Sequence, residues 1–318
     1  MSNKEPLLHV ENLHQHFKVG RKSVTRAVDG INFDIYEGET YGLVGESGSG
    51  KSTTGRAIIR LYEPTDGTII FDGRDISKKL SKEDESYLRT NMQMIFQDPM
   101  ACLNPRKKVH EIIADGLRIH GVCKDEHEIN ERVNQVLDKV GLSREQATRF
   151  PHQFSGGQRQ RVGIARALVM NPKLVIADEC ISALDVSIQA QVVNLMKDIQ
   201  DDLGTTYLFI AHDLSMVKYI SDRIGVMHLG HIVETGTTDE IFDNPIHPYT
   251  RSLLSAIPHP NPIIEKRRKA MTYNKEAEGV DYHAGIIHNL SETHSVLATE
   301  EEFIKWQEDA KKFYEVAE

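Results

Sequence analysis

The sequence has few cysteines, no long apolar run and no excess of basic residues. Its three cysteines, Cys102, Cys123 and Cys180, lack metal-site spacing and are odd in number, which favours free thiols in a reducing cytosol. No apolar stretch approaches the ~20 residues that a membrane helix needs, and residues 1–20 lack the apolar core of a secretory signal. A net charge of −9 argues against a nucleic-acid surface. We therefore expect a cytosolic protein of one large domain or two small ones.

A glycine-rich stretch at residues 45–53 matches the phosphate-binding pattern G-x-x-x-x-G-K-[ST]. The apolar run at 40–44 predicts a strand before it, and 51–61 has the apolar spacing of a helix after it. This context argues against the alternative of a Gly/Ser-rich surface loop. Glycines let backbone N–H groups turn around a polyphosphate, and the helix points its positive end at the same charge. The residues expected to bind nucleotide phosphates are Gly45, Ser47, Gly48, Ser49, Gly50, Lys51, Ser52 and Thr53.

Two further buried strands are predicted to end in polar residues. The apolar run 174–177 leads into Asp178 and Glu179, and the run 208–211 leads into His212. Strands of a doubly wound parallel sheet present their carboxyl ends to one ligand-binding crevice. We therefore expect a metal-binding carboxylate, a base and a phosphate contact to lie together beside the phosphate loop.

The segments around these strands predict two additional parts. Residues 7–71 contain short β-prone runs separated by Asp-Gly and Glu-Gly turn signals, which predicts a strand-rich beginning. Residues 109–140 are charged and have helical periodicity, which predicts a helical insertion between two parts of the nucleotide site. Two apolar stripes are expected to face its core: Ile112, Ile113, Leu117 and Ile119, then Val133, Val136, Leu137 and Val140.

Three other features leave alternatives open. The run Ser155-Gly156-Gly157-Gln158 predicts a capped helix N-terminus, which is a potential anion site but also a common structural feature. Phe17, expected in a loop, has the properties of a base-stacking ring or of a core residue. His14 and His16 are expected on one face of an edge strand, where solvated histidines are favoured over a metal site.

Taken together, these segments closely resemble the nucleotide-binding subunits of ATP-binding-cassette (ABC) transporters over residues 7 to about 258. The resemblance implies an α/β fold of the P-loop NTPase type, with a parallel core sheet and an N-terminal antiparallel β subdomain. It also implies a helical insertion and a C-terminal extension. The ATPase domain is expected at residues 1–240, its helical subdomain at about 98–170 and the extension at 241–318.

The resemblance also implies roles in hydrolysis. ATP would be the substrate, with Mg²⁺ arranged by Ser52, Gln97 and Asp178. Glu179 would be the catalytic base, and His212 would contact the γ-phosphate. Gln97, in the position of the Q-loop, would sense both the metal and a membrane partner.

Further nucleotide contacts are implied on both sides of a two-subunit assembly. Phe17 falls where the family places the ring that stacks on adenine. The signature and D-loop residues implied to bind nucleotide are Ser155, Gly156, Gly157, Gln158 and Asp185, and in this family Ser155 and Gly157 act on the nucleotide of the opposing subunit. Phe154 stands where leucine is usual in the signature, and Cys180 stands where proline is expected after the glutamate. Neither change removes a ligand or a base, and Cys180 is expected to be a packing residue.

Two segments narrow the resemblance to oligopeptide and dipeptide importers. Residues 96–106 resemble the Q-loop of that group, and residues 244–254 resemble its C-terminal His-Pro-Tyr element. The implied function is ATP hydrolysis that powers oligopeptide import, as in F-type ATPase subunits. The alternatives are a soluble ABC ATPase without a transport role, or an importer of another substrate such as nickel or dipeptides. Many related subunits carry an iron–sulfur centre in the extension, but no cysteine follows Cys180, so none is expected here.

The implied partners place this chain at the cytoplasmic face of the cell membrane as a peripheral subunit. A D-type ATPase subunit is expected opposite it, although a homodimer remains an alternative. Two integral membrane permease subunits would bind the pair, an extracytoplasmic peptide-binding protein would act indirectly, and no nucleic acid is expected.

The C-terminal end carries a weaker signal. Residues 258–262 predict a stiff proline-rich linker, and residues 264–318 are highly charged and end in a predicted helix. The apolar stripe of this helix comprises Phe303, Trp306, Ala310, Phe313 and Tyr314. Packing on the body of the same chain is favoured over docking on a partner, and no functional role is assigned.

Overall fold

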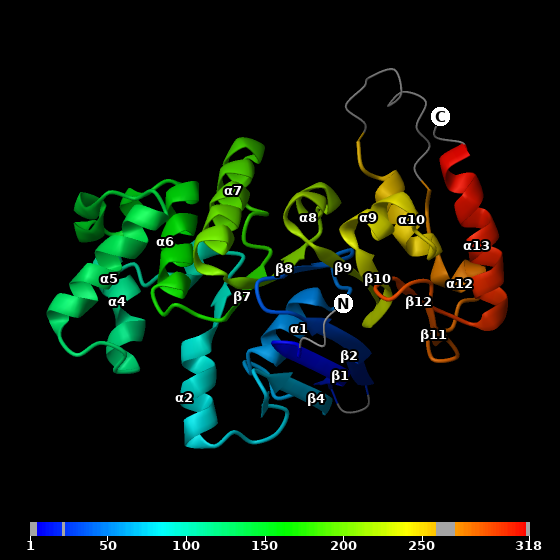
Figure 1. Ribbon diagram of the computed structural model, residues 1–318, viewed down its shortest axis with the longest axis horizontal. Coiled ribbons are helices and arrows are strands. Elements are labelled where there is room, and N and C mark those ends of the chain that lie inside the picture. Colours follow the sequence, from blue (N-terminus) through cyan, green and yellow to red (C-terminus); the bar gives the residue numbers. More distant parts are fainter. Residues whose placement is uncertain (1–4, 21–22, 259–270, 316–318) are drawn as a thin grey trace.

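The computed structural model describes the backbone of residues 5–20, 23–258 and 271–315, with side chains through residue 311. Its centre is an eight-stranded sheet with a helical lobe on one side and a C-terminal extension on the other (Figure 1). The five strands from β9 to β6 are parallel, as expected for the core. In spatial order the strands are β11 (Ile286–Asn289), β12 (Ser295–Ala298), β10 (His231–Thr237), β9 (Arg223–His228), β3 (Thr40–Val44), β8 (Thr206–Ala211), β7 (Leu174–Asp178) and β6 (Met92–Ile95).

The three central strands β3, β8 and β7 are buried along their whole length. Their apolar sequences suit this position, since a parallel strand covered on both faces has no polar side to alternate with. Each strand ends where the sequence predicted it to end. Because they are adjacent and parallel, their carboxyl ends lie at one edge of the sheet.

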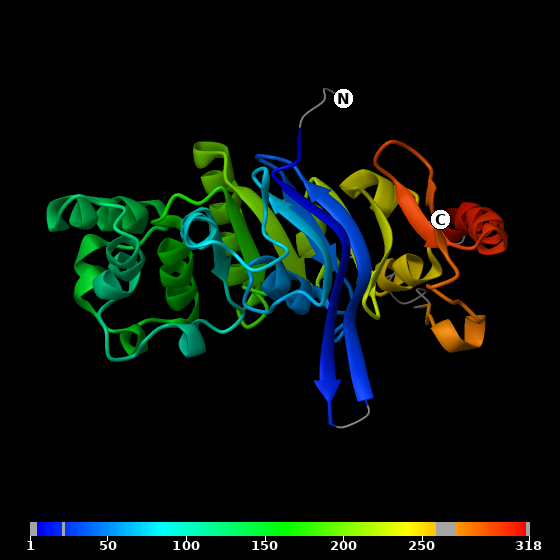
Figure 2. The ribbon, with the colours of Figure 1, turned by 90° about the horizontal axis from the view of Figure 1, so that it is seen from below.

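A second, antiparallel sheet forms the N-terminal part, as expected. Its order is β2-β1-β4-β5, from β1 (Leu8–Val19), β2 (Ser23–Ile35), β4 (Asp66–Phe71) and β5 (Arg74–Asp75). Figure 2 shows the long β1–β2 ribbon extending beyond the core. The expectation of an edge strand is wrong for His14, because β1 pairs there with both β2 and β4, whereas His16 lies beyond the part of β1 that pairs with β4. Phe17 likewise lies within β1 and not in a loop, because register shifts let the ladder continue to Val19.

The helical lobe is built from α3, α4, α5 and α6, which pack around one apolar core. The second predicted stripe, from Val133 to Val140, is buried. In the first stripe Ile119 is wrong, since it is 77% exposed. It follows Leu117 by two residues, which is about 200° around the helix and therefore away from the core.

The remaining bounds complete the chain. Helix α1 was expected to end at residue 61 but ends three residues earlier, at Ile58. Two residues after its end, Arg60 has a left-handed backbone (φ 62). Among the described residues every helix is too short or too polar to span a bilayer. The helices are α1 (Lys51–Ile58), α2 (Lys82–Asn91), α3 (Pro99–Cys102), α4 (Val109–Ile119), α5 (Glu126–Lys139), η1 (Arg144–Thr148), η2 (Pro151–Gln153), α6 (Gly156–Leu168), α7 (Val186–Leu203), α8 (Leu214–Ile220), α9 (Thr238–Asp243), α10 (Pro248–Ser255), α12 (Lys275–Glu278) and α13 (Glu300–Glu315).

The extension is joined to the core sheet, because β12 pairs with β10 and β11 with β12. Buried Glu234 of β10 holds it further: its carboxylate accepts hydrogen bonds from the backbone N–H of Ile246 and His247 and lies 2.8 Å from His294 Nε2. Sequence patterns did not predict β11 and β12, which have only four residues each. The proline-rich linker falls almost wholly on residues 259–270, outside the described residues.

Helix α13 packs on the chain's own body, as favoured from the sequence. Trp306 is 2% exposed, its ring centroid lies 4.7 Å from that of His247, and its carbonyl accepts a hydrogen bond from Arg251 Nη1 at 3.1 Å. Ala310 is also buried. Phe303 is half-buried, with its ring stacked on that of His288 at a centroid distance of 4.3 Å. The two remaining members of the predicted stripe, at positions 313 and 314, lie where side chains are not described.

Replacing Trp306 by alanine is expected to lower the free energy of unfolding by roughly 3–5 kcal/mol, the usual cost of a cavity of this size. Denaturation should be followed by circular dichroism, since Trp306 is the only tryptophan. Ile304→Ala is the matched control, because Ile304 lies on the same helix and is 55% exposed. The control should change stability by less than about 0.5 kcal/mol. Equal losses in both variants would contradict the packing.

Candidate nucleotide site

The phosphate loop connects β3 to α1, and close packing requires two of its glycines. A Cβ on Gly45 would lie 2.1 Å from the carbonyl oxygen of Met227, and one on Gly50 would lie 2.2 Å from that of Ala27. Gly50 also has φ 110, a left-handed conformation that other residues rarely adopt. The loop therefore packs directly against the backbone of β9 and of β2. It also curves around its own centre.

Lys51 lies inside this loop. Its side chain is 3% exposed, and Nζ donates to the carbonyl oxygens of Gly45 and Glu46, each at 2.8 Å. Burial lowers the pKa of Lys51 below its ordinary value, although the negative charges of Glu179 and Asp178 oppose that shift. The Lys51 ammonium group is thus held at the position where the loop faces the phosphates.

Asp178, at the end of β7, contacts the first turn of α1. Ser52 Oγ donates to Asp178 Oδ1 at 2.5 Å, and Arg56 Nη2 donates to Oδ2 at 3.3 Å. The contact to Ser52 brings together two residues that the sequence assigned to one metal site. Arg56 was missed, but it follows Ser52 by four residues and therefore lies on the same helix face.

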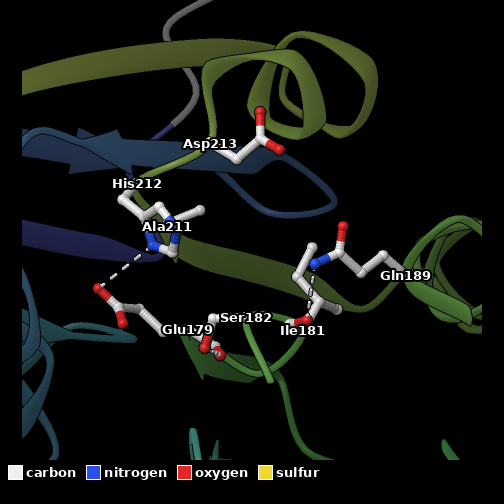
Figure 3. A pocket seen from close by; sticks show the side chains of 7 residues that line it. All are labelled: Glu179, Ile181, Ser182, Gln189, Ala211, His212 and Asp213. Carbon is white, nitrogen blue, oxygen red and sulfur yellow. Dashed lines mark hydrogen bonds and ion pairs between the residues drawn. The ribbon is translucent and has the colours of Figure 1, made fainter. Parts of the chain in front are cut away.

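Two of the predicted catalytic residues, Glu179 and His212, line a small pocket at the strand ends (Figure 3), and Gln97 contacts Glu179. Gln97 Nε2 donates to Glu179 Oε2 at 2.8 Å, and His212 Nδ1 lies 3.9 Å from Glu179 Oε1. Glu179 is 17% exposed, whereas His212 is 56% exposed. The backbone of Glu179 is left-handed (φ 45), which is uncommon outside glycine and occurs preferentially at functional positions. Gln97, Glu179 and His212 follow β6, β7 and β8, so the predicted convergence of strand ends is present.

Cys180 follows Glu179 in the chain and is buried. Its side chain is 2% exposed, and burial raises the pKa of the thiol to about 12. The thiol is therefore neutral at physiological pH, as expected of a packing residue.

The signature and D-loop residues lie elsewhere in the chain. Ser155 caps α6, with a reciprocal bond between the Ser155 backbone N–H and Gln158 Oε1 at 3.0 Å. Figure 1 shows α6 in the helical lobe, apart from α1. Asp185 precedes α7 and is exposed. Gly157 allows the close approach of α7, because a Cβ there would lie 2.6 Å from Ile188 Cγ2.

Phe17 is half-buried on β1, with its ring edge-on to that of Tyr62 at a centroid distance of 5.3 Å. A second aromatic side chain therefore lies beside Phe17. Its contact to a base stays a prediction.

The His-Pro-Tyr element reaches the phosphate loop, which the sequence did not suggest. Tyr249 is 2% exposed, and its hydroxyl accepts a hydrogen bond of 2.8 Å from the Glu46 N–H. His247 caps the same helix, because its Nδ1 accepts from the Tyr249 N–H at 3.0 Å. The two bonded residues are 203 positions apart, and no local pattern reports such a contact.

Tyr249→Phe is expected to lower the free energy of unfolding by about 1–3 kcal/mol, because the Glu46 N–H loses its acceptor while the ring packing is kept. ATP affinity should fall with it, since Glu46 lies in the loop. Denaturant titration and nucleotide titration measure the two effects. Tyr219→Phe provides the control, as its ring is 54% exposed and its hydroxyl bonds to Asn194 Oδ1. If both variants behave alike, the bond to Glu46 has no energetic role.

The fold and the strand-end site define an ABC-type ATPase, and the comparisons agree. A family model for "ABC transporter" matches residues 28–182, and one for the "Oligopeptide/dipeptide transporter, C-terminal region" matches residues 233–281. The chain belongs to the ABC transporter family. A dimeric ATP-binding cassette, solved in a post-hydrolysis state with ADP and Pi, is 28% identical with a TM-score of 0.66; the match covers 73% of this chain and 98% of that one.

More similar relatives are named as subunits of peptide transport systems. The oligopeptide transport ATP-binding protein OppF of Bacillus subtilis is 56% identical over 94% of this chain and 98% of its own length. The dipeptide transport ATP-binding protein DppF of Lactococcus lactis is 52% identical over 98% of this chain and 99% of its own length.

Proposed function

We propose that this chain is the ATP-hydrolysing subunit of an importer of oligopeptides, bound peripherally at the cytoplasmic face of the membrane. The observation that carries the proposal is the hydrogen bond between Tyr249 and the Glu46 N–H. It joins the element typical of peptide importers to the loop that binds nucleotide. The 56% identity to an oligopeptide transport ATP-binding protein supports the same substrate class.

In this proposal the phosphate loop binds the ATP polyphosphate. Lys51 exchanges its present contacts with two loop carbonyls for phosphate oxygens, and the loop N–H groups at the N-terminus of α1 donate to the same anion. The exposed loop residues Ser47 and Gly48 approach the phosphates from outside. Phe17, with Tyr62 beside it, offers an aromatic surface for adenine.

The residues around Ser52 fit a magnesium ion. Mg²⁺ prefers oxygen ligands, and the Ser52 hydroxyl and the Asp178 carboxylate supply two oxygens already in contact. When bound, the ion neutralises phosphate charge. Arg56 shares the Asp178 carboxylate and keeps it oriented toward α1. The Gln97 amide lies next to this group through its bond to Glu179.

Glu179 acts as the general base for hydrolysis. Its carboxylate accepts the proton of the attacking water while the bond from Gln97 holds one oxygen in place. His212 follows the neighbouring strand and faces the other oxygen, from where its exposed ring can contact the γ-phosphate. The left-handed backbone at Glu179 directs the carboxylate out of the strand end and toward this group.

Two subunits complete each site. The N-terminus of α6, in the helical lobe, carries Ser155, Gly156, Gly157 and Gln158, and Asp185 lies at the N-terminus of α7. In this proposal both helix N-termini face a nucleotide held by a second subunit. Val186, next to Asp185, is 75% exposed, which suits a surface that a partner covers. A related D-type subunit is the proposed partner, with a second copy of this chain as the alternative. The segment after Gln97 and the helical lobe would transmit closure to two membrane permease subunits.

Purification from gently solubilised membranes tests this proposal. A tagged chain should recover a second ATPase subunit and two integral membrane proteins, and the assembly in proteoliposomes should take up oligopeptides with ATP. A Lys51→Ala chain serves as the control, since it should recover the same partners without supporting uptake. Recovery only from the soluble fraction, with full ATPase activity and no membrane partners, would contradict the transport role.

A further inference from the structure

Four histidines gather around one buried carboxylate outside the nucleotide site. Asp29 lies in β2 and is 7% exposed. His14 and His16 come from β1, His231 begins β10, and His283 comes from the extension. These imidazoles therefore reach one point from three separate segments of the chain. His14 and His16 are not simply solvated, since each side chain is only 23% exposed.

The distances are close to those within a metal coordination shell. His14 Nδ1 lies 2.9 Å and His16 Nε2 lies 3.3 Å from Asp29 Oδ1, and His283 Nε2 lies 3.8 Å from Oδ2. Ligand atoms at ~2.0–2.1 Å from a tetrahedral zinc ion are about 3.3 Å from one another. Two overlapping groups have ligand atoms that all lie within 4.8 Å: His14, His16 and Asp29, and Asp29, His231 and His283.

The contacts of His14 point to a cation between its ring and Asp29. His14 Nε2 lies 3.1 Å from the Asn12 amide oxygen, which can only accept a hydrogen bond, so this nitrogen carries a proton. In a neutral ring Nδ1 then has a free lone pair directed at the Asp29 carboxylate. The Nδ1 lone pair and the negatively charged carboxylate repel each other unless a second proton or a metal ion lies between them. An outer oxygen that orients the far nitrogen is also the usual support of a metal-binding histidine.

Arg26 competes with an ion for the Asp29 carboxylate. Its Nη1 lies 3.4 Å from Asp29 Oδ2, but its side chain is 58% exposed and can turn outward when an ion binds.

We propose that Asp29, His14, His16, His231 and His283 form a binding site for a divalent transition-metal ion of the zinc class. Imidazole and carboxylate together suit such ions, in contrast to the all-oxygen shells of Mg²⁺ and Ca²⁺. Asp29 is common to both groups, so one ion would take the Asp29 carboxylate and the two imidazoles of one group, with water completing a tetrahedral shell.

Such a site would join the extension to the phosphate loop. The Asp29 N–H donates to the Gly230 carbonyl at 2.9 Å, and the Gly230 N–H donates to the Ser49 carbonyl at 2.9 Å. An ion held by β1, β2, β10 and His283 would therefore stabilise the turn that supports the loop. Because the ion binds the folded chain, it should raise the temperature of unfolding.

The test uses the untagged full chain, stripped with EDTA and free of nucleotide, which itself chelates metals. Calorimetric titration with Zn²⁺ should give saturable binding of one ion per chain at micromolar concentration or below. Co²⁺ should give the intense visible absorption of a tetrahedral site. The double variant His16→Gln/His283→Gln removes one ligand from each group, and its Zn²⁺ affinity should fall by at least the 10–100-fold that even outer-shell changes cause.

His127→Gln is the matched control, since His127 is 83% exposed on α5 and far outside the cluster in sequence. It should retain wild-type affinity and the thermal shift with Zn²⁺. ATP binding by both variants shows that they are folded, and His231→Gln repeats the test from β10. The proposal is overturned if wild type shows no saturable Zn²⁺ binding. It is equally overturned if the double variant binds Zn²⁺ as tightly as His127→Gln, which would leave a network of protonated histidines on Asp29.

Discussion

Lys51→Ala is expected to weaken ATP binding by about 10- to 100-fold and to abolish hydrolysis at physiological ATP. A hydrogen bond to a charged group contributes about 1.5–3 kcal/mol, and the lysine ammonium is the cation buried within the loop. The loss should be specific to nucleotide. Removing a buried ammonium also relieves its desolvation, so the free energy of unfolding should change less than the free energy of binding.

Nucleotide titration and steady-state ATPase assays measure these effects. Lys82→Ala is the control, because Lys82 is an exposed residue at the start of α2. It should bind and hydrolyse ATP as wild type does. Equal affinity and equal turnover for Lys51→Ala would remove the phosphate-loop assignment altogether.

Glu179→Gln is expected to keep ATP bound while slowing hydrolysis by about 10²–10⁴-fold, the usual contribution of a general base. The amide keeps the shape of the side chain but cannot take the proton of the attacking water. In the two-subunit mechanism proposed above, ATP would then persist between the subunits, because closure would need bound ATP and opening its hydrolysis. Peptide uptake should stop.

Sizing of the Glu179→Gln chain with ATP, alone and with the candidate D-type partner, detects the trapped assembly. The assay also separates a heterodimer from a homodimer. Glu83→Gln is the control, since Glu83 is 85% exposed and lies on α2. A monomer under both conditions, together with normal peptide uptake in cells, would defeat the two-subunit mechanism.

The features that the sequence predicted correctly have local signals. The phosphate loop, the end of β7 and the end of β8 each combine a short apolar run with the polar residue that follows it. A parallel sheet then brings these ends together without further information. The fold class follows from the same runs, and Glu179 and His212 were found for this reason, whereas Gln97 was assigned from the family resemblance.

The features that the sequence missed depend on contacts between distant segments. Tyr249 lies beside Glu46 at the start of α10, where Glu234 of β10 accepts hydrogen bonds from the backbone N–H of Ile246 and His247. The setting of His14 was misjudged for a related reason, since an edge strand becomes an inner one only when β4 returns beside β1. The error at Ile119 has a local cause instead. An apolar residue two positions after Leu117 cannot lie on the same face of the helix.

The pairing of β12 with β10 has a consequence for how this chain can be divided. A chain cut after residue 240 would leave one flank of β10 without its neighbour, and unpaired strand flanks are templates for aggregation. The same cut would remove Tyr249 from the Glu46 N–H. Exchange of C-terminal segments between importers therefore alters the support of the ATP-binding loop as well, and a chimera has to carry β10, the His-Pro-Tyr helix and β12 as one unit.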